Sequence, residues 1–191
     1  EDRDGCPDPD NDKDGVPDVK DACPNDPEDK DGVEDEDGCP EPDPSGPVII
    51  SGNDILILEK VQFETGKARI LPASDKILDA VAQTLKDHPE FLLVEVQGHA
   101  DERADDNYNL QLTKQRAAAV VEALVKRRTD KSRLRPMGFG EYCPLDPEHN
   151  DAAWEKNRRV EFKIVKTKDG PTGVELGCAK AKEKGIQSPP P

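Results

Sequence analysis

The chain has 191 residues, of which 33% are hydrophobic and 36% are charged, and its formal net charge is −15. This hydrophobic content is too low for one core along the whole length, so we expect one ordinary domain and an appendage without a core. The acidity argues against nucleic acid as a partner, because phosphate binding requires the opposite charge. Since no apolar run is long enough to span a bilayer, we expect any membrane attachment to lie in parts of the protein outside this chain.

The negative charge is concentrated in residues 1–46, which hold 19 acidic residues against four basic ones and carry a net charge of −15. In this segment a Cys-Pro pair recurs every 16 or 17 residues, and the sequence Asp-Lys-Asp-Gly-Val occurs at 12–16 and again at 29–33. A repeat of this length is a structural unit only if something other than apolar burial holds it together. We therefore predict an irregular repeat segment that is separate from the globular domain.

The first repeat has the spacing of a calcium-binding loop. Carboxylates fall at positions 1, 3, 5, 9 and 12 of a twelve-residue segment with glycine at position 6, the pattern by which an EF-hand loop surrounds calcium with oxygen atoms. The predicted ligands are Asp10, Asp12, Asp14, Asp18, Asp21 and the backbone carbonyl of Val16. The flanks are rich in proline and lack helical periodicity, so we expect a calcium loop without the EF-hand helices.

The second repeat keeps only part of this pattern. It retains Asp29, Asp31 and Asp35 as predicted ligands, but position 1 is Pro27 and position 12 is Gly38. We therefore expect the second repeat to bind calcium more weakly than the first, or to share ligands with it.

Over residues 1–43 the pattern resembles the thrombospondin type 3 repeat. This resemblance implies bound calcium and disulfides between successive repeats. With calcium the segment should be a stiff spacer, whereas without it repulsion between like charges should extend and loosen the segment. A solvated acidic linker is the alternative interpretation, but it does not account for the register of five aspartates and a glycine.

From Val48 onward the apolar pattern becomes regular. Alternation with a period of two predicts strands at about 55–57, 61–63, 92–96 and 160–164, and a short strand at 134–137. Helical periodicity and capping residues predict helices over about 72–86 and 109–126. We therefore predict an α+β fold of the βαβαβ type, with a mixed sheet and helices packed on one face. Function should reside in the loops where strands end.

Three blocks of residues carry a resemblance to a known family. They are Gly-His-Ala-Asp-Glu-Arg at 98–103, Tyr-Asn-Leu-x-Leu-Thr-x-x-Arg-Ala at 108–117, and Asn-Arg-Arg-Val at 157–160. In order and spacing they resemble the OmpA C-terminal domain family, which includes peptidoglycan-associated lipoprotein and the peptidoglycan-binding part of flagellar stator proteins. The resemblance covers roughly residues 54–166. It implies peptidoglycan binding at the periplasmic face of the outer membrane, with a Tol-system or other envelope protein as a further partner.

The charged residues of these blocks suit a zwitterionic ligand. The free end of meso-diaminopimelate in a peptidoglycan stem has an ammonium and a carboxylate on one carbon, so its site needs a carboxylate and a guanidinium a few ångströms apart. The resemblance implies that Asp101 binds the ammonium and Arg116 the carboxylate. The other predicted site residues are Asn109 for an amide contact, Arg158 to close the pocket, and Phe63 and Leu112 as walls.

Two other interpretations remain open at this point. One makes Asp101 and Arg116 a structural ion pair, and the other makes the domain a scaffold in a calcium-dependent structural or adhesive module with no cell-wall ligand. Catalysis is not expected, because the three histidines have no further metal ligand or nucleophile at motif spacing. Arg159 is expected to be solvated, since strand alternation places it opposite Arg158.

The five cysteines favour disulfides in an oxidising compartment, because none lies in a zinc-ligand pattern. Pairing arithmetic predicts a bond between Cys143 and Cys178, which would tether the segment after the last strand to the domain. Residues 180–191 are predicted to be disordered. The predicted parts of the chain are calcium-binding repeats at 1–46, a peptidoglycan-binding domain at 47–167, and an extension at 168–191 that is tethered and then disordered.

Overall fold

The computed structural model describes residues 9–24, 27, 38 and 47–190 of the chain. Contacts between Cα atoms divide the chain into two compact units, Glu1–Gly46 and Pro47–Pro191. The metal ligands predicted in the second repeat, which are Asp29, Asp31 and Asp35, lie outside the described residues.

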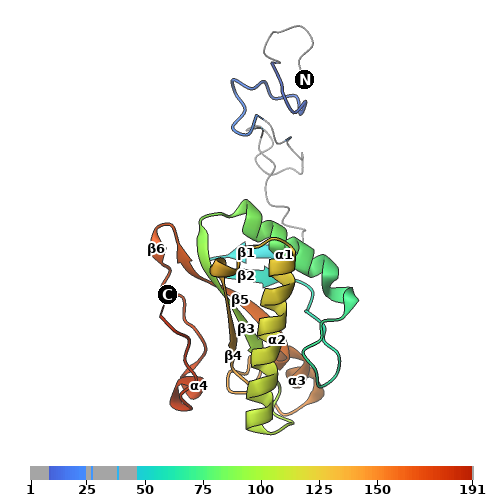
Figure 1. The fold of residues 1–191 in the computed structure, drawn as a ribbon, viewed down its shortest axis with the longest axis vertical. Helices are drawn as coiled ribbons and strands as arrows, with labels where there is room; N and C mark the ends of the chain where they lie inside the picture. Colours follow the sequence, from blue (N-terminus) through green and yellow to red (C-terminus); the bar gives the residue numbers. More distant parts are fainter. Residues whose placement is uncertain (1–8, 25–26, 28–37, 39–46, 191) are drawn as a thin grey trace. The chain divides into compact units, whose positions relative to one another are not determined.

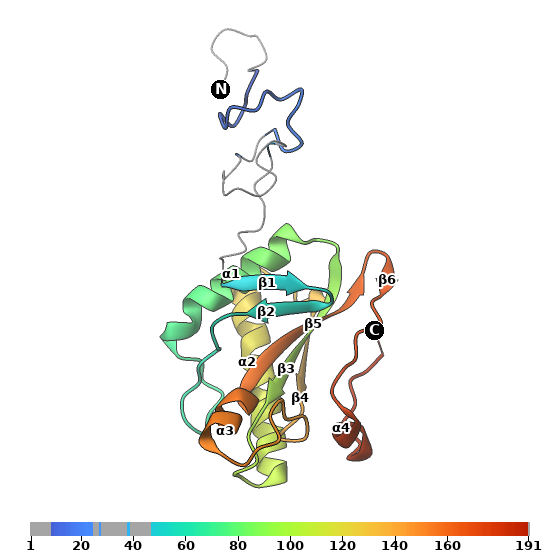
Figure 2. The same ribbon diagram turned by 180° about the vertical axis from the view of Figure 1, so that it is seen from behind.

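The second unit is built on a six-stranded mixed sheet (Figures 1 and 2). Five strands follow the order β1-β2-β5-β3-β4, and β6 pairs with β5. Strands β3 and β4 pair in parallel, whereas the other pairs are antiparallel. The strands are β1 (Val48–Ser51), β2 (Asp54–Ile57), β3 (Phe91–His99), β4 (Leu134–Gly138), β5 (Arg159–Thr167) and β6 (Gly170–Pro171).

Two long helices, α1 (Asp75–Asp87) and α2 (Asp106–Lys126), cover one face of this sheet (Figure 1). Seen from behind, the opposite face carries no long helix (Figure 2). The shorter helical elements are η1 (Pro72–Ser74), η2 (Lys131–Arg133), α3 (Asp151–Asn157) and α4 (Ala179–Glu183). The predicted α+β fold, with a mixed sheet and helices on one face, is therefore confirmed.

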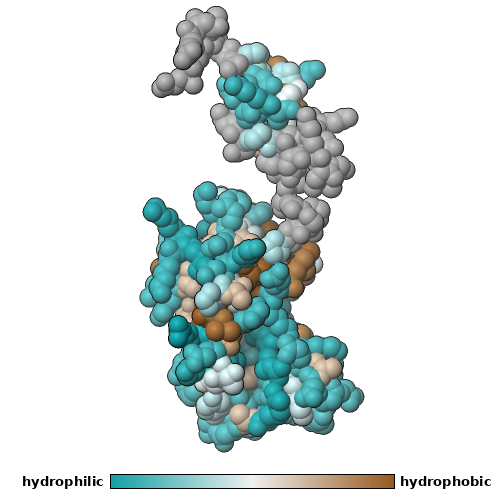
Figure 3. All heavy atoms as spheres, turned by 90° about the vertical axis from the view of Figure 1, so that its right-hand side faces the viewer, coloured by the Kyte–Doolittle hydropathy of each residue, from teal (hydrophilic) through white to brown (hydrophobic). Residues whose placement is uncertain are grey.

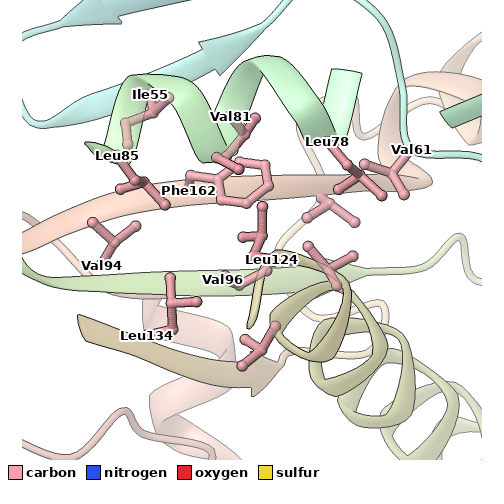
Figure 4. Close-up of a cluster of buried hydrophobic side chains, with 14 of the residues drawn as sticks. Ile55, Val61, Leu78, Val81, Leu85, Val94, Val96, Leu124, Leu134 and Phe162 are labelled. Atoms are coloured by element: carbon pink, nitrogen blue, oxygen red, sulfur yellow. The ribbon is translucent and has the colours of Figure 1, made fainter. Parts of the chain in front are cut away.

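The core lies between the two long helices and the sheet. The stripe of α1 that was predicted from helical periodicity is buried, and its members include Leu78, Val81 and Leu85. Figure 4 shows these side chains pointing toward Phe162 of β5, with Val94 of β3 on the same side of the sheet. Because every one of these residues is almost fully buried, the core fixes the distance between the helices and the strands.

Helix α2 packs tightly against two strands at glycine residues. A Cβ atom at Gly98 of β3 would lie 2.5 Å from the carbonyl oxygen of Thr113, and one at Gly138 of β4 would clash with the backbone nitrogen of Lys114. The Thr113 side chain is fully buried and accepts a hydrogen bond from the Gly140 nitrogen at 3.0 Å. These contacts hold the first half of α2 beside the end of β3.

Two local predictions differ from the structure. Val61–Phe63 is not a strand, because Phe63 forms an isolated bridge with Ile70 and the segment joins no sheet strand. Helix α3 was not predicted, and it begins at a capping residue, Asn150, whose side chain accepts a hydrogen bond from the Ala153 nitrogen.

The predicted Cys143–Cys178 disulfide is confirmed. The prediction of disorder from residue 180 onward is wrong for 180–190, since Ala181 in α4 is fully buried and Ile186 is only 8% exposed. Both side chains belong to a small buried cluster with Phe139 and Tyr142. The disulfide already holds this polar segment near its packing surface, so two apolar side chains are enough to order it.

On the face seen in Figure 3, polar and charged residues predominate and the hydrophobic areas are small and separate. Within the parts of the chain that the structure describes, no helix combines the length and the apolar character needed to cross a membrane.

Candidate ligand-binding groove

A groove of about 790 Å³ opens beside the end of β3. Its walls come from the loop after β3, the first half of α2, the segment between β2 and η1, and the start of β5. The lining contains all six predicted site residues, which are Phe63, Asp101, Asn109, Leu112, Arg116 and Arg158. The fold therefore gathers the three sequence blocks and Phe63 around one cavity.

Asp101 is the most enclosed carboxylate of the groove, with 10% of its side chain exposed. Its Oδ1 accepts hydrogen bonds from the nitrogen of Arg103 at 3.1 Å and from Nε of Arg103 at 3.2 Å. Its Oδ2 accepts from Nη2 of Arg103 at 2.8 Å and from Nη1 of Arg158 at 2.6 Å. Burial alone would raise the pKa of Asp101, but these bonds outweigh burial and lower the pKa to about 2.

Arg103 was missed as a site residue, although it makes most of the contacts to Asp101. Its guanidinium carbon lies 4.6 Å from the ring centre of Trp154 in α3. The Trp154 Nε1 donates to Glu102 at 3.1 Å, and Nδ1 of His149 also contacts Glu102. The loop after β3 is thus clamped against α3. The sequence signal for Arg103 was its place in the 98–103 block, but its partner Trp154 is 51 positions away in the chain.

Arg116 extends from α2 toward the segment between β2 and η1. Its Nε donates to the carbonyl oxygen of Lys67 at 3.1 Å, and its guanidinium carbon lies 4.9 Å from the ring centre of Phe63. Burial lowers the pKa of Arg116 and Tyr108 partly opposes this, but a guanidinium remains charged at neutral pH.

Among the described residues, no carboxylate forms an ion pair with Arg116. Asp101 pairs with Arg103 and Arg158 instead. The interpretation of Asp101 and Arg116 as a structural ion pair is therefore wrong. A partly buried cation with free donors is suited to bind an anionic group that enters the groove.

Asn109 lies in the first turns of α2 and is buried. Its amide nitrogen donates to the carbonyl oxygen of Asp101 at 2.9 Å and to Oε2 of Glu141 at 2.6 Å. Both amide hydrogens are thus used within the protein. Asn109 ties the loop after β3 to α2, while the half-buried Leu112 and Phe63 line the groove as predicted walls.

Arg158 links Asp101 to a further carboxylate, because its Nη2 contacts Glu155. Glu155 in turn accepts from Nζ of Lys60 at 3.0 Å. The charged side chains that face the groove are mainly cationic: Lys60, Arg103, Arg116 and Arg158 against Asp101 and Glu155. An anionic ligand would therefore be attracted to the groove.

Arg159 is not solvated as predicted, since only 11% of its side chain is exposed. Its Nε donates to Oε1 of Glu161 at 2.5 Å, and its Nη2 donates to the carbonyl oxygen of Cys143 at 3.2 Å. Strand alternation does separate it from Arg158, but the other face of β5 is covered at this point by the chain around Cys143.

Comparison with known proteins assigns the part of the chain that carries the groove to a protein family. The profile of the OmpA family matches residues 62–158, which is about half of the chain. The chain belongs to the OmpA family. All six predicted site residues lie within this matched OmpA domain.

Relatives of the OmpA domain include two bacterial lipoproteins. Probable lipoprotein YiaD of Escherichia coli K12 is 33% identical over 116 residues, which cover 60% of this chain and 52% of that protein. The peptidoglycan-associated lipoprotein of Pseudomonas aeruginosa is 34% identical over 101 residues, which cover 53% and 59%. The chain thus spans between half and three fifths of the length of these curated relatives.

A solved structure supports the same assignment. The crystal structure of the peptidoglycan-associated lipoprotein from Burkholderia pseudomallei matches with a TM-score of 0.50 and 30% identity, covering 56% of this chain and 90% of that one. The match confirms the arrangement of sheet and helices that carries the groove.

The first of the predicted calcium loops lies in the other unit, outside the OmpA domain. Oxygen atoms of Asp10, Asp12 and Asp14 all lie within 4.8 Å of one another. Oδ2 of Asp12 and Oδ2 of Asp21 are buried and have no hydrogen-bond partner among the described residues. Burial, together with repulsion from neighbouring carboxylates, raises the pKa of Asp12. Crowded oxygen atoms of this kind fit a hard cation such as calcium.

Other predicted ligands of the loop make local contacts. The side chain of Asp18 accepts from Asn11, through the backbone nitrogen at 2.9 Å and the side-chain amide at 2.7 Å. The nitrogen of Val16 donates to Oδ1 of Asp14 at 2.6 Å. Gly15 has a φ of +100°, the conformation for which position 6 of the pattern requires glycine.

Proposed function

We propose that the OmpA domain binds peptidoglycan non-covalently, through the diaminopimelate of the peptide stem, and does not catalyse a reaction. One observation carries this proposal: the groove of Asp101 contains a second, opposite charge, Arg116, that has no carboxylate partner among the described residues. The ligand chemistry that completes such a groove is an ammonium and a carboxylate on one carbon. The name of the relatives from Pseudomonas and Burkholderia, peptidoglycan-associated lipoprotein, supports peptidoglycan as the ligand.

Arg116 is the group that receives the ligand carboxylate. Its Nε is occupied by the carbonyl oxygen of Lys67, which leaves Nη1 and Nη2 for a pair of parallel hydrogen bonds. The ring of Phe63 supports the guanidinium plane and limits its rotation. The carboxylate of the ligand therefore meets donors whose orientation is already fixed.

Asp101 receives the ligand ammonium by exchanging one of its present partners. A carboxylate offers about four lone-pair positions, and four donors from Arg103 and Arg158 already occupy them. Arg158 is the partner that gives way, because Glu155 is available to it as a second acceptor. Once released, Arg158 closes the groove over a further carboxylate of the peptide stem.

At the level of the whole protein, this binding anchors the outer membrane or an envelope complex to the cell wall from the periplasmic side. The repeat segment acts as the spacer, and its first loop binds calcium through Asp10, Asp12, Asp14 and Asp21 with the carbonyl oxygen of Val16. Bound calcium would neutralise the crowded carboxylates and stiffen the segment. The support for this part is the group of buried carboxylate oxygens without hydrogen-bond partners.

Calorimetric titration with a stem peptide that contains diaminopimelate tests the proposal. We expect Asp101→Ala and Arg116→Ala each to weaken binding by about 30-fold or more, because truncating one partner of an enclosed charge pair costs about 2–5 kcal/mol. Lys114→Ala is the matched control, since it removes a cation from the exposed side of the same helix. A stem peptide with lysine in place of diaminopimelate lacks the carboxylate for Arg116 and should bind about as weakly as the variants.

Two results would overturn the proposal. If the parent protein binds neither peptide, the anchor function is wrong, and the calcium-dependent interaction module becomes the function to test. If both peptides bind equally, Arg116 does not recognise the ligand carboxylate.

A further inference from the structure

The groove is supported on one side by a short support segment, which we define as residues 139–143. Backbone hydrogen bonds join it to the end of β3, from the nitrogen of Phe139 to the Gly98 oxygen at 2.9 Å and from the nitrogen of Ala100 to the Gly140 oxygen at 2.8 Å. A third bond runs from the nitrogen of Gly140 to Oγ1 of Thr113 in α2 at 3.0 Å. The support segment thus contacts both elements that carry the charged residues of the groove.

Side chains of the support segment extend this contact to Asp101. Oε2 of Glu141 accepts from the amide of Asn109 at 2.6 Å, and the same amide donates to the carbonyl oxygen of Asp101 at 2.9 Å. The hydroxyl of Tyr142 donates to Oδ2 of Asp106 at 3.0 Å, at the start of α2. The backbone position of Asp101 therefore depends on Asn109, whose own position depends on Glu141.

The support segment is in turn held by the C-terminal extension, residues 168–190. Cys143 is disulfide-bonded to Cys178, and the buried side chains of Ala181 and Ile186 pack against Phe139 and its neighbours. Gly177 lies against the ring of Phe139 so closely that a Cβ atom there would clash with it.

The far end of the extension is fixed to the sheet. Oγ of Ser188 donates to Oε1 of Glu95 at 2.7 Å, and the carbonyl oxygen of Pro190 accepts from Nη1 of Arg135 at 3.1 Å. In Figures 1 and 2 the extension runs beside β4. Since two apolar side chains bury little surface, the disulfide is the strongest link between the extension and the support segment.

We propose that the Cys143–Cys178 disulfide and the C-terminal extension position Asp101 for ligand binding, through Glu141 and Asn109. This inference rests on the proposed function of the groove. Without the disulfide, the extension separates from Phe139 and Tyr142 and the support segment gains freedom. Asn109 then holds the carbonyl group of Asp101 less firmly. Ligand binding must order this loop, and the entropy lost in that ordering lowers the affinity. Glu141, Cys143 and Cys178 are therefore positioning residues that do not touch the ligand.

The test compares Cys143→Ala/Cys178→Ala with the parent protein by titration with the diaminopimelate stem peptide. We expect the double variant to raise the Kd about fivefold. This is the low end of the changes in affinity that coupled sites show. Glu141→Ala should have a similar effect, and Glu141→Gln should restore much of the affinity because its amide oxygen still accepts from Asn109. Lys182→Ala is the control on the same extension, because this side chain is 47% exposed and its ion-pair partner among the described residues is Glu175 alone.

A double-mutant cycle identifies the route. If the disulfide acts through Glu141, the variant that lacks both the disulfide and the Glu141 carboxylate should bind about as well as either single variant. Independent effects would instead make it bind about 25-fold more weakly than the parent. Amide hydrogen exchange of residues 100–104 in the ligand-free protein should be faster in both variants, whereas the Lys182→Ala variant should match the parent.

The outcomes separate this inference from the proposed function. If the parent binds the peptide and the disulfide variant binds it equally well with unchanged exchange at 100–104, the positioning role is wrong. If the parent does not bind, the proposed function is wrong, and the exchange measurement still decides whether the disulfide orders the loop. If the disulfide variant does not fold, Glu141→Ala and Glu141→Gln provide the same comparison with the disulfide intact.

Discussion

Asp101 keeps its negative charge in an enclosed position because Arg103 and Arg158 surround it. Its pKa in the folded protein is about 2, below the ordinary value of 3.8. A carboxyl group whose pKa is lowered by folding contributes stability above its unfolded pKa, and this stability is lost as the pH falls through the folded value. The pH range in which Asp101 affects unfolding is therefore about 4 to 2.

We predict that the thermal unfolding midpoint of the parent falls between pH 4 and pH 2 more steeply than that of Asp101→Asn. The expected difference in the free energy of unfolding is about 1 kcal/mol, because both arginines are partly exposed and solvent screens the pairs. Circular dichroism melts from pH 5 to pH 2 measure it. Parallel curves for parent and variant would mean that the two ion pairs contribute nothing to stability.

A second prediction at this scale concerns the shape of the cation at position 116. Arg116→Lys keeps the charge but loses the two parallel donors and the contact with Phe63, so we expect the stem peptide to bind about tenfold more weakly. Arg69→Lys is the control, because its side chain is 80% exposed. Titration gives both affinities, and equal affinity of the Arg116→Lys variant and the parent would show that charge alone is recognised.

Single residues differ in how far the sequence could predict them. Asp101 and Arg116 were identified from the blocks and their spacing, Phe63 was predicted as a wall of the site, and the structure brings all three to one groove. Arg103 was missed because its contact with Asp101 depends on the ring of Trp154, which tertiary packing supplies. Asn109 was predicted to contact the ligand, and no pattern in the sequence indicates that Asp101 and Glu141 occupy its amide nitrogen.

Elements with a regular apolar period were predicted well, and elements ordered by contacts distant in sequence were not. The stripe of α1 and the alternation in β5 are local signals of packing against one core. Residues 61–63 alternate for a different reason, because Val61 and Phe63 both pack against the core at the edge of the groove without joining a sheet strand. Helix α4 has too few apolar residues for any periodic signal, so its order depends on the disulfide and on Phe139.

The packing of α2 against β4 yields a prediction at the element scale. A Cβ atom at Gly138 would clash with the backbone of Lys114, so Gly138→Ala must push the helix outward. We expect a loss of about 2 kcal/mol in the free energy of unfolding, and weaker peptide binding because Leu112 and Arg116 move with the helix. Urea denaturation and titration measure the two effects.

The control for Gly138→Ala is Gly173→Ala. Gly173 has a φ of +72° and no atom within 4 Å of an added Cβ, so this change should cost only about 1 kcal/mol of backbone strain and leave peptide binding unchanged. If Gly138→Ala lowered stability without affecting the affinity, the position of α2 would not control the groove.

For the whole molecule, the unequal distribution of charge predicted the division into two parts. The excess of −15 lies in residues 1–46, and the structure separates Glu1–Gly46 from Pro47–Pro191 at the same boundary. The crowded carboxylates of the first unit are suited to a cation, whereas the groove of the second is lined mainly by cationic side chains. Calcium and the peptide stem should therefore bind as independent ligands.

We predict that Asp12→Asn weakens calcium binding at least about tenfold and leaves the affinity for the stem peptide unchanged, because the variant removes one negative charge from the group of carboxylates in the first unit. The pKa of Asp12 is raised, so protons should compete with calcium at a higher pH than for an ordinary aspartate. Calcium titration of the parent at several pH values, beside Glu59→Gln as a control with the same charge change in the second unit, measures both effects. If calcium itself altered the affinity for the peptide, the repeats would regulate the groove, and a purely mechanical role for the spacer would be wrong.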